Sequence, residues 1–322
     1  MNQPHLVISL DFELLWGVFD KINPAEKLKY FKNTREVIPE ILKLFTSYNI
    51  RCAWATVGML FNKDAEAWLA NQPETLPNYE NQELSAYRFF KENKKELDGL
   101  FCFAHELINE IKESEGQEIG THTYSHYYCL ENGQNLTSFK ADLKMAVKLA
   151  KEAEIDLKSL VFPRNQFNLE YLKACKELGI TSVRSNPPNW YWKNTQKDTL
   201  QQKIFRTADA YMGQKDKSYA LESIDSSNPD LPLQQPASRL LRPHANNFLD
   251  GLKLKRIKAE MIHAAQNNLV YHLWWHPHNF GNSPVQSLRE LEEILKCFAK
   301  CQSKYRMQSS SMLDITNTFT SI

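Results

Sequence analysis

Short apolar runs alternate along the chain with longer stretches of helical periodicity. An apolar, β-branched run of about four to eight residues is typical of a buried strand, whereas apolar residues recurring roughly every three to four positions are typical of a packed helix. The predicted strands are 6–12, 51–57, 118–124, 159–165, 180–186, 238–244 and 269–276. The predicted helices include 33–48, 138–153, 169–178, 250–267 and 287–302. This alternation predicts an α/β fold in which helices cover parallel strands.

Two stretches interrupt the alternation, at about 61–98 and 187–236. The first contains "NQPETLPNYENQ" and the second "PPNWYW", and both are longer than ordinary connections between a strand and a helix. They are either functional lids and binding loops or solvated decorations of the surface. The strand count over 322 residues favours a barrel, although periodicity alone also fits an open sheet. We expect a single domain, 1–322, that carries both stretches as insertions.

Composition and charge exclude several classes of protein. The formal net charge is +1 and the sequence has no Lys/Arg cluster, so we expect neither nucleic acid nor an anionic membrane surface as a partner. No apolar stretch approaches the length of a membrane span. The start, "MNQPHLVISLDFELLWG", lacks the basic region of a signal peptide, and the six cysteines show no disulfide-framework spacing. We therefore expect reduced thiols and a cytoplasmic location.

Ionisable side chains stand where several predicted strands end. In parallel arrangements, the carboxyl ends of the strands and the following loops form the active face. Asp11 and Glu13 end the first strand and project to the same side, where two carboxylates repel each other unless a cation or an arginine lies between them. His122 ends the third strand, and a helical turn through "YSH" would place His126 one turn further on.

Two imidazoles, a carboxylate and an open position are typical of a catalytic divalent ion, most simply zinc. The same ligand types also suit non-haem iron, and the spacing of His122 and His126 alone is weak evidence because many histidines are packed or solvated. Arg164 follows an apolar run and a proline. It would hold the second carboxylate ionised, the alternative being a surface ion pair.

The last predicted strand carries three histidine candidates on or near it. Alternation puts His272, Trp274 and His276 on one side and Trp275 on the other. His276 stands at the rim and suits proton transfer over an aromatic floor, whereas His272 lies deeper and is expected to be structural. Each tryptophan is either a core residue or part of a sugar-binding pocket. The candidates for substrate binding are Trp275 and, in the following loop, His278.

Five short motifs carry a resemblance to a known family. They are "SLDFE" at 9–13, "CAWATVGML" at 52–60, "HTYSH" at 122–126, "RNQF" at 164–167 and "WWH" ending at 276. In this order, and over most of the chain, they resemble the motifs of the polysaccharide deacetylases of carbohydrate esterase family 4, the NodB-homology group. The resemblance implies a distorted (β/α)7 barrel of TIM type, a bound divalent metal ion such as Zn²⁺, and hydrolytic removal of N-acetyl, sometimes O-acetyl, groups from sugars.

The resemblance also implies roles for individual residues. The implied metal ligands are Glu13, His122 and His126. The implied catalytic residues are Asp11 as the base, Arg164 as its partner and His276 as the acid, with the backbone N–H of Phe167 helping to hold the oxyanion.

Three features depart from the family pattern. The acidic metal residue is Glu13 rather than aspartate, and Phe12 separates it from Asp11, which leaves open which carboxylate touches the metal. Asn165 and Gln166 stand where prolines are usual. The fourth motif, which orients the acid histidine, is not recognisable in "SVRSNPPNWYW".

The expected function is that of a metal-dependent hydrolase that removes N-acetyl groups from an acetamido sugar in a polysaccharide, an oligosaccharide or a sugar precursor. Without a signal peptide, a cytoplasmic nucleotide- or lipid-linked precursor is a plausible substrate. Two alternatives stay open. The first is a hydrolase of a non-sugar linear or cyclic amide, as in allantoinase-like relatives, and the second is a non-catalytic sugar-binding protein on the same fold.

Overall fold

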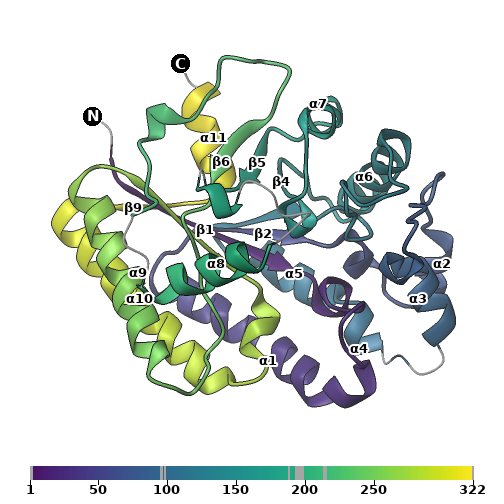
Figure 1. Ribbon diagram of the computed structural model, residues 1–322, viewed down its shortest axis with the longest axis horizontal. Coiled ribbons are helices and arrows are strands. Elements are labelled where there is room, and N and C mark those ends of the chain that lie inside the picture. Colours follow the sequence, from purple (N-terminus) through teal and green to yellow (C-terminus); the bar gives the residue numbers. More distant parts are fainter. Residues whose placement is uncertain are drawn as a thin grey trace.

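The computed structural model describes residues 3–94, 97, 99–187, 189–192, 199–212 and 216–320. Within these residues a sheet of nine strands forms the centre of the molecule, and its paired strands are parallel (Figure 1). The strands are β1 His5–Phe12, β2 Cys52–Thr56, β3 Gln117–Thr121, β4 Ser159–Val161, β5 Ser182–Ser185, β6 Leu233–Pro236, β7 Arg239–Leu240, β8 Val270–Trp275 and β9 Gln308–Ser310. The predicted α/β class is confirmed.

The sheet curls, and one continuous piece of chain joins its two ends. In the order β6-β5-β4-β3-β2-β1-β8-β7, only Ala237 and Ser238 separate the terminal strands β6 and β7. The amide of Ala237 donates to the carbonyl of Ser185 in β5, and the amide of Ser238 donates to that of His272 in β8. With β6 and β7 counted as one position and β9 left aside, the nine strands make seven positions. The predicted distorted (β/α)7 barrel is confirmed in this form.

Helices lie on the outside of the curled sheet, with α1, α9 and α10 on one flank and α6 and α7 on another (Figure 1). The helices of the described residues are α1 Leu28–Ser47, α2 Ala65–Ala70, α3 Ala86–Asn93, α4 Gly99–Cys102, α5 His105–Glu113, α6 Leu136–Glu152, α7 Leu169–Glu177, α8 Leu200–Met212, α9 Leu249–Gln266, α10 Pro284–Tyr305 and α11 Met312–Thr320. Because helices cover the sheet from outside and side chains fill it from inside, β1 and β8 are buried along nearly their whole length.

The two predicted insertions contain more regular structure than the sequence pattern suggests. The first holds α2 and α3, and its Trp68 is buried against Phe90 with ring centroids 4.3 Å apart. This part is therefore packed on the core and is not a solvated decoration. In the second, the short 3-10 helix Trp190–Trp192, α8 and β6 are described, whereas 188, 193–198 and 213–215 lie outside the described residues.

Several elements have no counterpart among the predicted ones: the strands β6 and β9 and the helices α2, α3, α4, α5, α8 and α11. The sequences of β6, "LQQP", and β9, "QSS", have no apolar run, so only their pairing with β5 and β1 makes them strands. In the described part of the chain, no helix combines the length and apolar character needed to cross a membrane.

Candidate active site

A pocket of about 330 Å³ opens at the carboxyl ends of the strands. It is lined by groups from β1, from the loops after β3 and β4, and from β7 and β8 with their following segments. The ionisable side chains on its wall are Asp11, Glu13, Lys21, His122, His126, Arg164, His276 and His278. The structure therefore brings together at one site nearly all the side chains that the sequence singles out.

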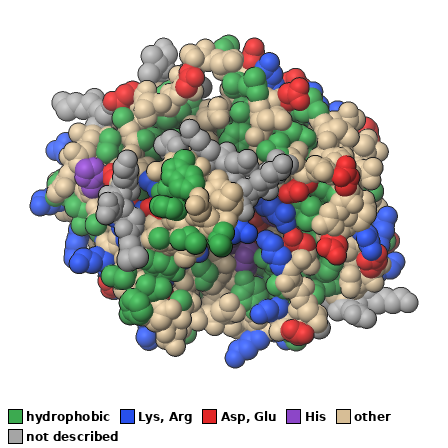
Figure 2. Space-filling view, viewed as in Figure 1, with side chains coloured by type: hydrophobic (Ala, Val, Ile, Leu, Met, Phe, Trp, Pro, Cys, Tyr) green, Lys and Arg blue, Asp and Glu red, His purple; other side chains and the backbone are tan. Residues whose placement is uncertain are grey.

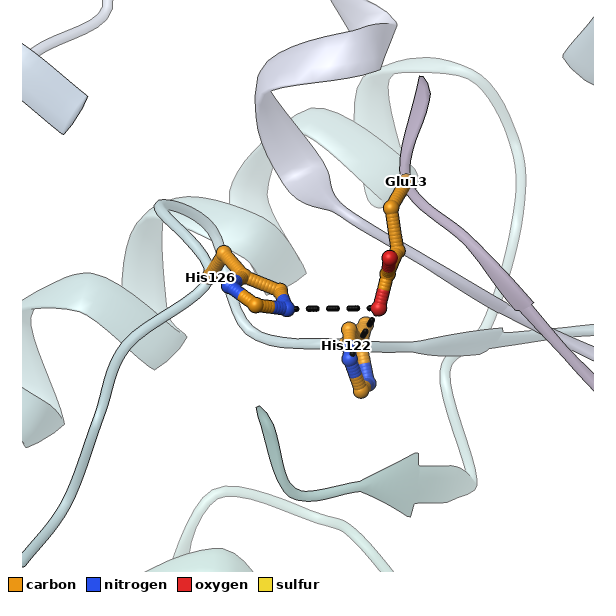
Figure 3. Close-up of side chains that lie close together, drawn as sticks. All are labelled: Glu13, His122 and His126. Atoms are coloured by element: carbon orange, nitrogen blue, oxygen red, sulfur yellow. Dashed lines mark hydrogen bonds and ion pairs between the residues drawn. The ribbon is translucent and has the colours of Figure 1, made fainter. Parts of the chain in front are cut away.

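Glu13, His122 and His126 line this pocket, and their side chains point toward one another, as Figure 3 shows. One carboxylate oxygen of Glu13, Oε1, lies 3.0 Å from Nε2 of His122 and 3.2 Å from Nε2 of His126. All three side chains are buried. Two ligands of a tetrahedral zinc ion, each about 2.0–2.1 Å from the metal, lie roughly 3.3 Å apart. The observed separations therefore match the edges of such a coordination shell.

The hydrogen bonding of His122 requires a metal ion or a proton between its ring and the carboxylate of Glu13. Its Nδ1 lies 2.8 Å from the carbonyl oxygen of Val161, which accepts only, so Nδ1 carries the proton. In the neutral ring the lone pair of Nε2 then faces the carboxylate oxygen of Glu13. Two acceptors in contact repel each other unless a metal ion or a proton lies between them, and a carbonyl behind the ligating histidine is the usual support of a metal site. The residues present thus fit a divalent ion.

An aspartate in α6 supports the loop that carries the second histidine. Thr123 and His126 have positive φ angles of 63° and 57°. Residues other than glycine occupy this left-handed backbone region at an energetic cost. Asp142 accepts hydrogen bonds from the amides of Tyr124 (2.7 Å) and Ser125 (3.1 Å) and from the Ser125 hydroxyl (2.5 Å). Burial raises the pKa of Asp142 to about 7 against these hydrogen bonds. The sequence prediction does not include Asp142. Its only signal in the sequence is its place on the apolar face of the predicted helix 138–153.

Gly17 and His278 form a cradle around the carboxylate of Glu13. A Cβ atom at Gly17 would overlap Oε2 and Cδ of Glu13, so the glycine leaves the space that the longer acidic side chain occupies. Nδ1 of His278 lies 3.7 Å from the same Oε2. Burial opposes ionisation of Glu13, but the nearby rings of His276 and His126 outweigh it and hold the pKa of Glu13 well below its usual range. A glutamate at this position is therefore accommodated by its surroundings.

The second carboxylate, Asp11, is engaged by an arginine that the sequence analysis did not name. Both oxygens of Asp11 accept from the guanidinium of Arg184 in β5, each at 2.7 Å, and both side chains are buried. Burial alone would raise the pKa of Asp11, but Arg184, with His122 and His276 nearby, outweighs it and lowers the pKa. Because the Asp11 oxygens are bound to Arg184, Glu13 is the carboxylate that faces the two imidazoles.

Arg164 occupies a different place from the predicted one. Its guanidinium pairs with Asp20 at 2.5 Å and lies 4.0 Å from the ring centroid of Tyr128. The expected pairing of Arg164 with Asp11 is thus corrected: Arg184 holds that position. Arg164 nevertheless lines the pocket, and it and Asn165 both have a φ of 52°. Two consecutive residues in the left-handed region are a costly arrangement of the kind that clusters at functional sites.

The three histidines near the end of β8 have different surroundings. His276 lines the pocket with its side chain 26% exposed, and its Nε2 lies 3.6 Å from Oδ2 of Asp11. His278 also lines the pocket, but burial lowers its pKa to about 4, so it is neutral near pH 7. His272 is buried, and its Nε2 lies 2.9 Å from the hydroxyl oxygen of Ser9, in the predicted structural role. His276 alone combines access to the pocket with a place beside the base candidate.

The tryptophan that faces the pocket is Trp274 and not Trp275. Trp275 is buried in the hydrophobic core, where its ring stacks on Phe280 with centroids 6.0 Å apart. Trp274 lines the pocket, and the guanidinium of Arg184 lies 4.1 Å from its ring centroid. The candidate role of Trp275 in substrate binding is therefore corrected. Strand alternation already places Trp274 on the side of His276.

Comparison with known proteins agrees with this geometry. The family profile described as polysaccharide deacetylase matches residues 15–183, more than half of the chain. The chain belongs to the polysaccharide deacetylase family. The matched range contains His122, His126 and Arg164, whereas Asp11, Glu13 and Arg184 lie just outside it. A search of curated proteins finds no relative of the chain.

Solved structures share the deacetylase fold at low sequence identity. A structure assigned as a polysaccharide deacetylase from Mycobacterium smegmatis is 13% identical with a TM-score of 0.62, covering 100% of this chain and 92% of that one. One assigned in the same way from Pseudomonas aeruginosa PAO1 is 11% identical with a TM-score of 0.60, covering 98% and 90%. Puue allantoinase is 12% identical with a TM-score of 0.55, covering 98% and 90%. At these identities the likeness shows the fold alone.

The third and fourth deacetylase motifs are the ones this chain builds differently. Phe167 is absent from the pocket wall, and its ring packs on Phe162 with centroids 5.1 Å apart. The amides of Asn165 and Gln166 donate to nearby backbone carbonyls. An oxyanion role for the N–H of Phe167 therefore stays a prediction. In the region of the missing fourth motif, the described residue that reaches the catalytic side chains is Arg184.

Proposed function

We propose that this protein is a metal-dependent hydrolase that removes the acetyl group from an acetamido sugar. The observation that carries the proposal is the placement of Asp11, paired with Arg184, and His276 beside the Glu13–His122–His126 cluster in one pocket. A base, an acid and a metal-binding triad at one point are the parts that amide hydrolysis needs. Family membership supports a hydrolase of amide or acetyl groups.

The metal ligands in this proposal are Glu13, His122 and His126, and Zn²⁺ is the ion that two imidazoles, a carboxylate and an open position suit best. Bound there, a divalent ion supplies Lewis acidity, which polarises the acetamide carbonyl and lowers the pKa of a water molecule. The protein holds these ligands in place: the backbone carbonyl of Val161 fixes the tautomer of His122, and Gly17, which has no side chain, makes room for Glu13.

Asp11 acts as the general base in this proposal. Arg184 binds both of its oxygens, which keeps the carboxylate ionised and fixes its direction toward the pocket. An attacking water placed between Asp11 and the triad would give its proton to Asp11.

His276 acts as the general acid and protonates the leaving amine. Its Nε2 lies 3.6 Å from Asp11 and 3.7 Å from Glu13, so its ring stands at the mouth of the same site. Trp274 and Arg164, which line the pocket, are proposed to contact the sugar, since aromatic faces pack on sugar rings and a guanidinium donates to hydroxyls. A cytoplasmic location stays part of the proposal.

The test is an acetate-release screen on the purified, metal-analysed protein. The substrates are N-acetylated sugars and oligosaccharides, together with linear and cyclic non-sugar amides. We expect one equivalent of bound metal and acetate release from at least one acetamido sugar, lost in Asp11→Asn. Turnover of non-sugar amides alone would replace the acetamido sugar as the substrate class. Sugar binding without any turnover by the metal-loaded protein would contradict the hydrolase assignment.

A further inference from the structure

A second cavity, of only about 20 Å³, adjoins the active-site pocket on the side of Trp274. Trp274 and Leu240 line both cavities. Pro243 belongs to the wall of the pocket, and the residue directly before it, Arg242, belongs to the wall of the smaller cavity. A substituent on a sugar bound in the pocket therefore has this cavity as its neighbour.

Cationic side chains dominate the smaller cavity. Its charged lining residues are Arg206, Lys217, Arg239, Arg242 and a single carboxylate, Asp209. Two of the cations are neutralised by the protein itself. Arg239 donates to both oxygens of Glu260 at 2.5 and 2.6 Å, and Lys217 forms an ion pair with Asp209. The carboxylates near this cavity are thus already engaged.

Arg242 differs from these cations because the described residues place no carboxylate against it. Its side chain is half-buried, its Nε is enclosed without a hydrogen-bond partner, and one terminal nitrogen lies 3.4 Å from the carbonyl oxygen of Arg206. A guanidinium has five N–H donors, so most of its capacity is unused here. A charge that is partly removed from water without a counterion is unfavourable, and a ligand that supplies the counterion relieves that cost.

We propose that a phosphate-type anion attached to the acetamido sugar binds at the opening of this cavity, with Arg242 as its principal ligand. The fork of a guanidinium matches two phosphate oxygens at once, and among the described residues no carboxylate pairs with Arg242. The substrate class is then an acetamido sugar phosphate or phosphodiester, whether its other end is a nucleoside or a lipid. This inference rests on the proposed deacetylase function.

The surroundings of the cavity suit the far end of such a substrate. Trp192 lines it, and the neighbouring rings of Trp190 and Phe205 are about half exposed and lie 5.2 Å apart. Exposed aromatic faces pack on a nucleobase or on an apolar chain. On the face seen in Figure 2, Lys and Arg side chains border a hollow in which a histidine is visible, and hydrophobic side chains gather beside it.

The experiment measures binding by calorimetry in the metal-loaded Asp11→Asn protein, so that ligands are not consumed. The probes are the methyl glycoside of N-acetylglucosamine, N-acetylglucosamine 1-phosphate, UDP-N-acetylglucosamine and farnesyl-diphospho-N-acetylglucosamine. Arg242→Gln removes the proposed ligand, and Arg242→Lys keeps the charge without the fork. Lys255→Gln in α9 removes the same charge from an exposed position away from both cavities and serves as the control.

We expect the phosphorylated probes to bind more tightly than the methyl glycoside. Arg242→Gln should weaken them about ten- to hundredfold, the scale of a charge-assisted hydrogen-bond pair, and leave the methyl glycoside within about twofold. The affinity of Arg242→Lys for the phosphorylated probes should fall between those of the parent and of Arg242→Gln, and the affinity of Lys255→Gln should match that of the parent. Tighter binding of the UDP probe than of the 1-phosphate identifies a nucleotide source, and tighter binding of the farnesyl probe identifies a lipid source.

Two results would overturn the inference: equal affinity of the parent for neutral and phosphorylated probes, or equal weakening of both classes by Arg242→Gln. Acetate release by the wild-type enzyme separates failure of the anion-site inference from failure of the proposed function. Release from neutral sugars without any dependence on Arg242 keeps the deacetylase and removes the anion site. Arg242-dependent binding of phosphorylated probes without acetate release from any sugar keeps the anion site and removes the deacetylase.

Discussion

Arg184 lies against Asp11, although the motif resemblance gives that place to Arg164. The resemblance locates an arginine after β4, but which guanidinium reaches the end of β1 depends on how the sheet curls. In β5, alternation puts Ser182 and Arg184 on the same side as each other, and both are buried. A buried arginine in a strand needs a carboxylate partner, so the signal that the sequence offers is an arginine inside the predicted strand 180–186.

The roles assigned to Arg184 and Arg164 predict different kinetic effects for substitutions at the two positions. Arg184→Lys keeps the buried charge but loses the bidentate grip on Asp11, so kcat should fall on the order of 10²-fold with metal content unchanged. Arg164→Gln should instead raise KM about tenfold and change kcat little, because Arg164 lines the pocket away from the base. Steady-state kinetics with metal analysis checks both.

Asp11→Asn serves as the reference for these arginine variants, since it removes the base and leaves the triad in place. The conservative lysine at 184 is chosen because removing one partner of a buried ion pair destabilises a fold by about 3–5 kcal/mol. If Arg164→Gln reproduced Asp11→Asn while Arg184→Lys were nearly neutral, the roles drawn here would have to be exchanged.

His276 and His278 are separable in the same way. His276→Ala should lower turnover about 10²–10⁴-fold without loss of metal, since it removes the general acid. His278→Ala should act through the metal site, because His278 lies beside Oε2 of Glu13 and is neutral near pH 7. We therefore expect weaker metal binding in His278→Ala, measured by competition with a chromogenic chelator. Retained metal with abolished turnover would identify His278 as the acid instead.

At the scale of elements, α6 does more than cover the barrel. Its Asp142 accepts from two backbone amides and a hydroxyl in the loop after β3, which holds the positive-φ residues of the histidine motif in place. The sequence predicts this helix at 138–153 from its apolar periodicity, and the structure has it at Leu136–Glu152. Periodicity assigns the face of a helix, but it cannot show that one buried carboxylate orders a neighbouring loop.

Asp142 predicts a particular dependence of stability on pH. Its folded-state pKa of about 7 lies above the unfolded value of about 3.9, so the folded protein binds the proton more tightly. The stability from this group is fully present below about pH 4 and is lost as pH rises through 7. Denaturant unfolding between pH 5 and 8 should show the wild-type free energy of unfolding falling relative to that of Asp142→Asn.

The asparagine variant is a suitable comparison because its amide oxygen can still accept from Tyr124 or Ser125 but cannot ionise in this range. Parallel pH profiles of the two proteins would mean that Asp142 is ionised throughout, held by its three donors.

Predictability from sequence differs between elements for a physical reason. Strands such as β1 and β8 are buried on both faces, so their apolar runs are long. The sequence therefore predicts their ends to within a residue or two. β6 is four residues with two glutamines, and only the hydrogen bonds to β5 define it. Because β6 has no apolar run, the sequence pattern places its residues in the second insertion and not in a strand.

At the scale of the whole molecule, a metal ion in the triad would tie the end of β1 to the loop after β3. Both segments are among the most buried of the chain and belong to different parts of the sequence. A ligand that binds only the folded state stabilises it by mass action. Metal binding should therefore be visible as global stability.

Chelation supplies the test. Removing metal with EDTA should lower the Tm of the wild-type protein by several degrees, and adding Zn²⁺ should restore it. His126→Ala, which lacks one ligand, should have a Tm that responds little to either treatment. An identical response of wild type and His126→Ala would place the stabilising ion elsewhere.

The absent side chain at Gly17 also bears on how this sequence can change over time. Because the carboxylate of Glu13 fills the space that a Cβ would take, any single-step mutation at 17 that adds a side chain should expel a metal ligand. Shortening Glu13 to aspartate would vacate that space and release position 17 from its constraint. The two sites should therefore be inherited as a pair. A lineage that carries the glutamate is bound to the glycine, and a change to aspartate at position 13 must precede any side chain at position 17.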